Sequence, residues 1–267
     1  MMFATDLDRT IIYSRRALKD LGTATPVQLQ AVEKLDGKDL SFMTEKAIQL
    51  LHGLSEELLL VPVTTRTTQQ YNRISLFKER IPVKYAVTYN GAEVLCEGKP
   101  LPDWREDITR RLKAECASHD DLKDLLQKET NQVKGRLNSA EELFLYYLLE
   151  EKLEAKQVQE FKRKASAYGW RVSYQGRKLY FMPAPISKGE AVSFIKEREG
   201  IGTLIGAGDS LLDEDFLVKC DHSFIPSHGE LSECNPLLTY IFTELQGVHA
   251  GEEILEKIRE IIFESSR

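Results

Sequence analysis

Short runs of apolar residues stand at several places along the chain, and each is followed closely by polar residues. Met2–Thr5, Leu58–Val63 and Thr203–Ala207 show no alternation of apolar and polar positions and are shorter than most helices. Such runs are typical of strands that are covered on both faces, as in a parallel sheet. Val83–Thr88 is a further strand of the same kind. The pattern therefore predicts the buried strands of an α/β core.

The segments around these runs carry turn and helix signals. Asp36-Gly37 lies inside Gln30–Met43 and predicts a small β-hairpin flap close to the loop that follows the first strand. Thr44–Gly53 is expected to be a helix, with Thr44 as its N-cap and Gly53 as its stop. Helices are also predicted from Ser187 to about Glu199 and over Ala250–Glu264. Strands that alternate with helices favour a doubly wound parallel sheet.

The middle of the chain, residues 93–180, has a different character. Its helices are charged and amphipathic, and its strands form hairpins, which predicts an inserted α+β domain between two core segments, 1–92 and 181–267. The expected elements are the helices Asp103–His119, Leu122–Thr130 and Glu151–Tyr168, the strand Leu143–Leu149, and a hairpin of Trp170–Tyr174 and Lys178–Met182 around Gln175-Gly176.

Composition narrows the class of protein. The 267 residues are 42% apolar and 29% charged, as in an ordinary globular protein, and the formal charge of −6 without a long basic run argues against a nucleic-acid partner. No apolar run is long enough to cross a bilayer, and the N-terminus does not read as a signal peptide. We expect a cytoplasmic monomer or small homo-oligomer with no membrane partner and with reduced, scattered cysteines, namely Cys96, Cys116, Cys220 and Cys234.

Polar side chains follow three of the predicted strands at the point where each strand ends. Asp6, Thr64 and Asp209 all stand there. Ligands of open α/β sheets bind outside the carboxyl ends of the strands, so these side chains are expected to meet at one edge of the sheet. Their convergence carries more weight than any one motif.

The pair Asp6 and Asp8 suits phosphoryl transfer. One carboxylate can attack phosphorus to form an aspartyl-phosphate, and the other can protonate the leaving alcohol and later deprotonate the attacking water. Two acids and a phosphate ester repel one another, so the site needs a cation, and Mg²⁺ prefers oxygen ligands. Asp209 and Asp213, four residues apart on one face of a predicted helix, add such ligands. Lys188, at the start of a predicted helix, can hold nucleophile and phosphate together as a point charge.

Four segments in this order resemble the haloacid dehalogenase (HAD) superfamily. They are Phe3–Thr10, Leu60–Arg66, Ile186–Gly189 and Gly208–Asp213. Asn90-Gly91 and the long insert before Lys188 are similar to the Cof-type branch with a C2B cap, to which sucrose-phosphate and mannosyl-3-phosphoglycerate phosphatases belong. The resemblance implies a Rossmann-like core, an inserted cap that closes over the site, and magnesium-dependent hydrolysis of a small phosphorylated metabolite, with sugar phosphates favoured.

The same resemblance assigns roles to residues. Asp6 would be the nucleophile and a metal ligand, and Asp8 the acid/base with its backbone carbonyl on the metal. Asp209 and Asp213 would complete the metal site, and Thr64 and Lys188 would hold the phosphate. The candidates for substrate binding are Thr10, Thr65, Arg66 and Asn90. The chain departs from the family's pattern at Arg9 and Thr65, where glycine is usual, and at Leu212, where asparagine is common.

Plainer interpretations stand beside several of these roles. Asp213 can be a helix-start aspartate, Arg66 can pair with a nearby acid, and Asn90 can be a turn residue. His222 and His228 are interpreted as structural, because no third ligand has zinc-like spacing. Glu214 and Asp215 are expected on a solvated face, and Phe144, Tyr146 and Tyr147 in the core of the insert. For the whole protein, a phosphosugar mutase and a weakly active phosphate-binding protein are the alternatives.

Overall fold

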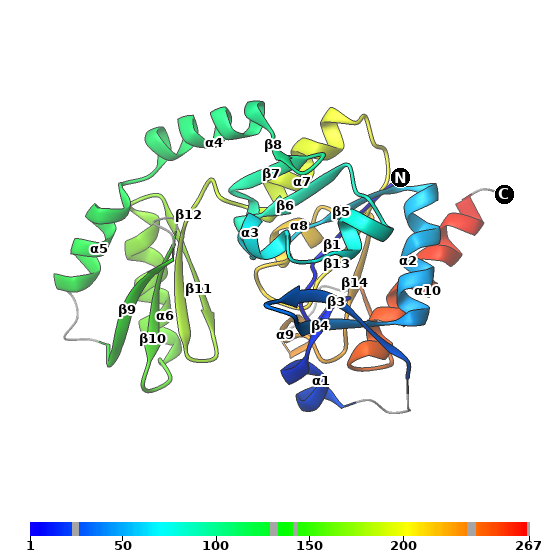
Figure 1. Cartoon of the computed structure of the whole chain (residues 1–267). Helices are drawn as coiled ribbons and strands as arrows, with labels where there is room; N and C mark the ends of the chain where they lie inside the picture. Colours follow the sequence, from blue (N-terminus) through cyan, green and yellow to red (C-terminus); the bar gives the residue numbers. More distant parts are fainter. Residues whose placement is uncertain (23–26, 129–132, 141–143, 234–238, 266–267) are drawn as a thin grey trace. The chain divides into compact units, whose positions relative to one another are not determined.

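The computed structural model describes residues 1–22, 27–128, 133–140, 144–233 and 239–265 (Figure 1). The chain divides into two compact units. The first consists of Met1–Leu101 and Ser187–Arg267, and the second is Pro102–Ile186. The second unit is thus an insert within the first.

The first unit is built on a five-stranded parallel sheet in the order β15-β14-β13-β1-β5. Its strands are β1 Met2–Thr5, β5 Leu59–Pro62, β13 Leu204–Ala207, β14 His222–Ile225 and β15 Tyr240–Phe242. β1 lies between β13 and β5, and all four of its residues are buried. Its carboxyl end therefore opens between the ends of these two strands, at the same edge of the sheet.

Helices cover both faces of this sheet, as the sequence predicts for a doubly wound fold. The helices are α2 Glu45–Glu57, α7 Lys188–Arg198, α8 Glu214–Leu217 and α10 Val248–Ser265. α2 and α10 lie side by side (Figure 1) and share one apolar core with Phe3 of β1 and Ile205 of β13. The alternate residue Gly206 faces α8, where an added Cβ would lie 3.0 Å from Leu217. Shorter helices are α1 Arg15–Leu21, α3 Thr68–Tyr71 and α9 Glu230–Glu233.

The predicted flap is present as a hairpin of β3 Leu29–Leu35 and β4 Lys38–Thr44, with β2 Tyr13–Ser14 beside β4. Asp36 and Gly37 form its turn, and their φ values of 50° and 74° are those of a type I′ turn. Thr44 caps α2 as expected. The stop expected at Gly53 is wrong, because the next residue, the buried Leu54, continues the packing of the helix, and α2 runs to Glu57.

A second small sheet, β6-β7-β8, moves the boundary of the insert. Its strands are β6 Tyr85–Thr88, β7 Glu93–Cys96 and β8 Lys99–Pro100. β7 pairs antiparallel with β6 along its whole length, so it belongs to the first unit. The insert consequently begins at Pro102 rather than at residue 93, and ends at Ile186 rather than at 180.

The second unit has a four-stranded antiparallel sheet in the order β11-β12-β10-β9. The strands are β9 Gly135–Ala140, β10 Phe144–Leu149, β11 Trp170–Gln175 and β12 Lys178–Pro183, and the helices are α4 Pro102–Glu115, α5 His119–Lys128 and α6 Ala155–Ser166. β9 was not anticipated, and residues 129–130 of the expected second helix lie outside the described residues. Tyr147 joins the core as expected, whereas Phe144 and Tyr146 are only partly buried and alternate with it along β10.

Two other expectations concern the state of the cysteines and the presence of a membrane-spanning helix. The cysteines at 96, 116 and 220 are free thiols, and Cys234 lies outside the described residues. Within the described ranges, no helix combines the length and the apolar character that a membrane span requires.

Candidate active site

Asp6 stands directly after β1, between the carboxyl ends of β5 and β13. Its backbone N–H donates to the carbonyl of Ala207 at 2.8 Å, which extends the pairing of β1 with β13 by one residue. The carboxylate is 6% exposed, and the hydroxyl of the fully buried Thr10 donates to its Oδ2 at 3.2 Å. Asp6 is therefore an acid held in a fixed orientation inside the protein.

Lys188 reaches the same point from the first turn of α7. Ser187 caps this helix through its side chain, which accepts from the backbone N–H of Glu190. The ammonium group is completely buried and donates to Asp6 Oδ1 at 2.8 Å and to Asp213 Oδ1 at 2.5 Å. One buried cation thus joins the first and the last acid of the predicted set.

Asp213 is brought to the site by a turn, not by the helix that the sequence suggested. α8 begins only at Glu214, and Asp213 makes no side-chain cap to it. Instead Asp213 Oδ2 accepts from the backbone N–H of Ser210 at 2.9 Å and from its hydroxyl at 2.8 Å. The turn packs so tightly that a Cβ on Gly208 would lie 2.5 Å from that of Asp213. Glycine is required there for steric reasons.

Asp209 completes a group of three buried acids. Asp6, Asp209 and Asp213 each place a carboxylate oxygen within 4.8 Å of the others. The guanidinium of Arg9 pairs with Asp209 Oδ2 at 3.3 Å. Arg9 adopts φ of 65°, a left-handed conformation that glycine adopts without strain, so the backbone here has the shape that glycine would favour.

The electrostatics of the group show an excess of negative charge. Burial, followed by the charge of Asp213, raises the pKa of Asp6 from 3.8 to about 7 despite the opposing effect of Lys188. The pKa of Asp209 is also raised well above its usual value, by burial first and then by Asp6 and Asp213. Burial by itself would lower the pKa of Lys188, but Asp213 and Asp6 raise it, so the lysine stays charged. A further cation would relieve this repulsion.

This charge excess predicts how stability depends on pH in the absence of metal. In the folded chain Asp6 holds its proton up to about pH 7, whereas the unfolded carboxyl releases it near 3.8. The folded state therefore binds more protons in this window, and stability falls as pH rises through it. Thermal unfolding in EDTA should show a lower Tm at pH 8 than at pH 5. A Tm that rises over this range would contradict the assignment.

Thr64 follows β5 and connects the sheet to the loop at Asn90. Its hydroxyl accepts from the backbone N–H of Arg66 at 3.1 Å, and its carbonyl accepts from that of Asn90 at 3.0 Å. Asn90 is 3% exposed with φ of 58°, and a Cβ on Gly91 would lie 2.2 Å from the carbonyl oxygen of Ser187. The loop thus packs against the start of α7, the turn that carries Lys188.

Asp8 points to a different set of partners. Arg66 donates from Nε and Nη2 to its two carboxylate oxygens, both at 2.7 Å. The third guanidinium nitrogen, Nη1, pairs with Glu33 of the flap at 2.9 Å. The side chain of Asp8 is 44% exposed, whereas that of Arg66 is only 13% exposed. Of the two interpretations of Arg66, pairing with acids is the one that these contacts display.

Several functional neighbours were not anticipated from the sequence. Glu33 and the ion pair of Arg9 belong to this group. His228 is structural, as expected, and makes two hydrogen bonds to the backbone. Its Nδ1 accepts from the N–H of Gly247, so Nε2 is the nitrogen that donates to the carbonyl of Arg9, at 2.8 Å. Asp215 was expected on a solvated face, which is wrong, since it accepts from the hydroxyl of Ser187 at 2.7 Å. Of the expected substrate contacts, Thr65 is exposed.

Comparisons with known proteins establish the fold. No protein-family model matches the sequence, and no curated protein matches it either. Among solved structures, the chain has the fold of the haloacid dehalogenase-like hydrolases, which confirms the fold class that the motifs suggested. The haloacid dehalogenase-like hydrolase yhjK of Bacillus subtilis gives a TM-score of 0.58 at 16% identity over 98% of this chain and 91% of that one.

Two further structures with this fold have names that refer to sugar phosphates. The sucrose-phosphatase of Synechocystis sp. PCC6803, solved with sucrose and phosphate, gives a TM-score of 0.68 at 14% identity and covers 97% of each chain. A trehalose-6-phosphate phosphatase related protein gives 0.54 at 17% identity over 99% of this chain and 100% of that one. At these identities the likeness establishes the fold.

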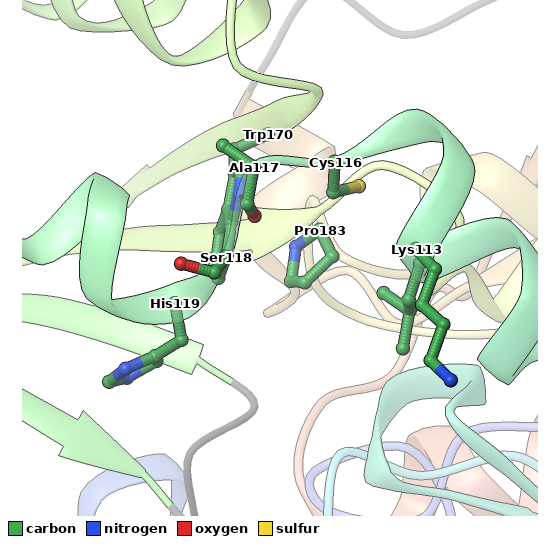
Figure 2. A pocket seen from close by; sticks show the side chains of 8 residues that line it. Lys113, Cys116, Ala117, Ser118, His119, Trp170 and Pro183 are labelled. Atoms are coloured by element: carbon green, nitrogen blue, oxygen red, sulfur yellow. Dashed lines mark hydrogen bonds between the residues drawn. The ribbon is translucent and has the colours of Figure 1, made fainter.

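The second unit contains a cavity of its own, of about 440 Å³ (Figure 2). Trp170 and Pro183 form part of its wall, and the indole N–H of Trp170 donates to the carbonyl of Ala117 at 3.0 Å. Cys116 lines it as well, and burial raises the pKa of this thiol. The lining is mainly apolar, unlike the acidic cluster of the first unit.

Proposed function

We propose that this protein hydrolyses small phosphate monoesters through an aspartyl-phosphate on Asp6. The observation that carries the proposal is the buried contact of Asp6 with Lys188, in the same cluster as Asp209 and Asp213. A carboxylate whose oxygen is fixed by a buried ammonium is held ready for in-line attack, and phosphoryl transfer depends mainly on such positioning.

The donor set fits a divalent cation. Three buried carboxylates converge, and the cations near them are Lys188 and the half-exposed Arg9. A phosphate ester would add more negative charge to the cluster. We propose that Asp6, Asp209 and Asp213 hold Mg²⁺, joined by the backbone carbonyl of Asp8. Bound there, the ion would offset the repulsion and polarise the phosphoryl oxygens.

The chain's own residues divide the reaction into two steps. In the first, an oxygen of Asp6 forms a bond to phosphorus while the bond to the ester oxygen breaks, and Asp8 gives its proton to the departing alcohol. In the second, Asp8 takes a proton from water, whose oxygen attacks phosphorus and releases Asp6 and inorganic phosphate. We propose that Lys188 neutralises charge near Asp6 and that Thr64 donates its hydroxyl to a phosphate oxygen.

Sugar phosphates are the proposed substrate class. Two structures that share the fold are named for phosphorylated disaccharides. We propose the insert Pro102–Ile186 as the part that selects the leaving group, the role that the inserted cap has in the family that the sequence motifs resemble. Thr10, Thr65, Arg66 and Asn90 are proposed to border the phosphate.

The proposal is tested by phosphate release from a panel of sugar phosphates and 4-nitrophenyl phosphate. With Mg²⁺ present, inorganic phosphate should appear without any bisphosphate activator. EDTA should lower the rate by about a hundredfold, because loss of a metal ion removes several kcal/mol of charge stabilisation, and added Mg²⁺ should restore it. A rate that thorough chelation leaves unchanged would contradict the assigned metal site.

The rivals predict different products. A phosphosugar mutase would return the phosphoryl group to a sugar and would need a bisphosphate to start. A phosphate-binding protein would bind the esters and release nothing. Phosphate release from a plain monoester separates the proposed hydrolase from both.

A further inference from the structure

Glu33 is an acid buried in the flap, where the hairpin's alternation is broken. Along β3 the neighbours Val32 and Glu33 are both buried, at 2% and 4% exposure, although consecutive strand residues normally face opposite sides. The pairing with β4 shifts at this point, so that Ala31 lies opposite Phe42 and Glu33 opposite Ser41. β-Bulges of this kind re-aim side chains, often beside active sites. Here the bulge turns a carboxylate inward.

The inward carboxylate binds Arg66 and Ser41. Its Oε2 lies 2.9 Å from Nη1 of Arg66 and accepts from the Ser41 hydroxyl at 2.6 Å. Arg66 uses Nε and Nη2 for Asp8. Each nitrogen of the guanidinium therefore has a carboxylate partner, with Glu33 on one side and Asp8 on the other. Because the guanidinium is planar and rigid, fixing one side of it orients the other.

We propose that Glu33 is a positioning residue for Asp8 and acts through Arg66. The inference rests on the proposed function, in which Asp8 protonates the leaving alcohol. A buried Glu33 sets the plane of Arg66, and that plane sets the two oxygens of Asp8. The flap is then part of the acid/base machinery. A structural ion pair alone would contribute to folding and leave the proton transfer unaffected.

The experiment compares two leaving groups. 4-Nitrophenolate departs without needing a proton, whereas a sugar alkoxide needs one from Asp8. The parameter is kcat/KM, which covers the reaction up to departure of the alcohol. In Glu33→Gln, kcat/KM for the best sugar phosphate should fall about 10- to 100-fold, the range expected for a misplaced catalytic group. For 4-nitrophenyl phosphate it should fall by less than about threefold.

Asp39→Asn is the matched control, because it makes the same type of change on the same hairpin. Asp39 pairs with the exposed Lys34 at 3.7 Å. The Asp39→Asn variant should leave kcat/KM unchanged for both esters. Ser41→Ala is the second variant, used if Glu33→Gln unfolds below the assay temperature. Ser41→Ala removes the hydrogen bond to Glu33 and the longer contact, at 3.5 Å, that Arg66 Nη2 makes to the same hydroxyl. Because both contacts hold the Glu33–Arg66 pair, the ratio of the two kcat/KM values should shift in the same direction, by up to about fivefold.

The outcomes separate a failure of the inference about Glu33 from a failure of the proposed hydrolase function. A larger fall in kcat/KM for the sugar phosphate than for 4-nitrophenyl phosphate supports the inference. Equal losses with both esters, or none, show that Glu33 is structural and overturn the inference while the hydrolase proposal stands. Failure of the wild-type protein to release phosphate from either ester overturns the proposed function and this inference together.

Discussion

Asp6→Asn is expected to lower phosphate release by at least about 10⁴-fold, the scale on which loss of a catalytic nucleophile acts. The amide keeps the shape of the side chain and can accept from Lys188, so the site's geometry is preserved. Its oxygen has lost the charge needed to attack phosphorus. Initial rates with saturating Mg²⁺ and the best ester of the panel measure the effect.

The same variant should not be destabilised in the absence of metal. The pKa of Asp6 is raised from 3.8 to about 7, which means that the folded site prefers the neutral side chain. At pH 8 in EDTA the Tm of Asp6→Asn should equal or exceed that of the wild type, and its decline between pH 5 and pH 8 should be smaller. Inactivity therefore cannot be attributed to unfolding.

Asp20→Asn serves as the control for this substitution. Asp20 is exposed at the end of α1 and pairs with Arg16 at 3.3 Å. Such surface pairs contribute little, so both rate and Tm should stay close to the wild type. An Asp6→Asn protein that keeps most of its turnover would remove Asp6 as nucleophile, and the covalent mechanism with it.

The elements predicted best are those whose signal is local. β1 has the bounds expected from its apolar run, and the turn at Asp36-Gly37 lies where the dipeptide indicates. Thr44 caps α2 as predicted, because a cap depends on the next three residues only. α7 begins at Lys188, one residue after the predicted start at Ser187. The helix stop predicted at Gly53 is wrong because it does not depend on local sequence alone. The effect of Gly53 on α2 depends on Leu54, whose burial is decided by the tertiary core.

The acidic cluster could be predicted because the ends of two neighbouring parallel strands deliver it: Asp6 follows β1, and Asp209 and Asp213 follow β13. Parallel strands place their carboxyl ends at one edge, which is a property of the fold and needs no contact to be known. The side-chain contacts around the cluster could not be predicted from the sequence. The pairing of Arg66 with Glu33 joins residues far apart in the chain and depends on a β-bulge that no local pattern announces. Asp213 likewise reaches the site through the turn at Ser210.

The second large effect is expected for Lys188→Met, which keeps most of the length of the unbranched side chain and removes its charge. Lys188 is fully buried and lies 2.8 Å from Asp6 and 2.5 Å from Asp213. Removing one partner from a buried ion pair costs about 3–5 kcal/mol, because the remaining charges are left uncompensated. Guanidinium unfolding at pH 8 in EDTA measures this loss. Turnover should fall by about a thousandfold, as when one preorganised donor is removed.

The loss of stability should itself depend on pH and on metal. Lys188 lowers the pKa of Asp6, so its removal should raise that pKa above about 7 and make protonation of the folded site easier. The loss of stability in Lys188→Met should therefore become smaller as pH falls, and Mg²⁺ at pH 8 should restore part of the stability by supplying positive charge.

Lys219→Met is the control, since Lys219 is partly exposed and pairs with Glu190 on the surface. It should change stability by less than about 0.5 kcal/mol. A Lys188→Met protein as stable as this control at pH 8 would show that the acids are not charged together in the folded site, and the case for a divalent cation there would lose its electrostatic basis.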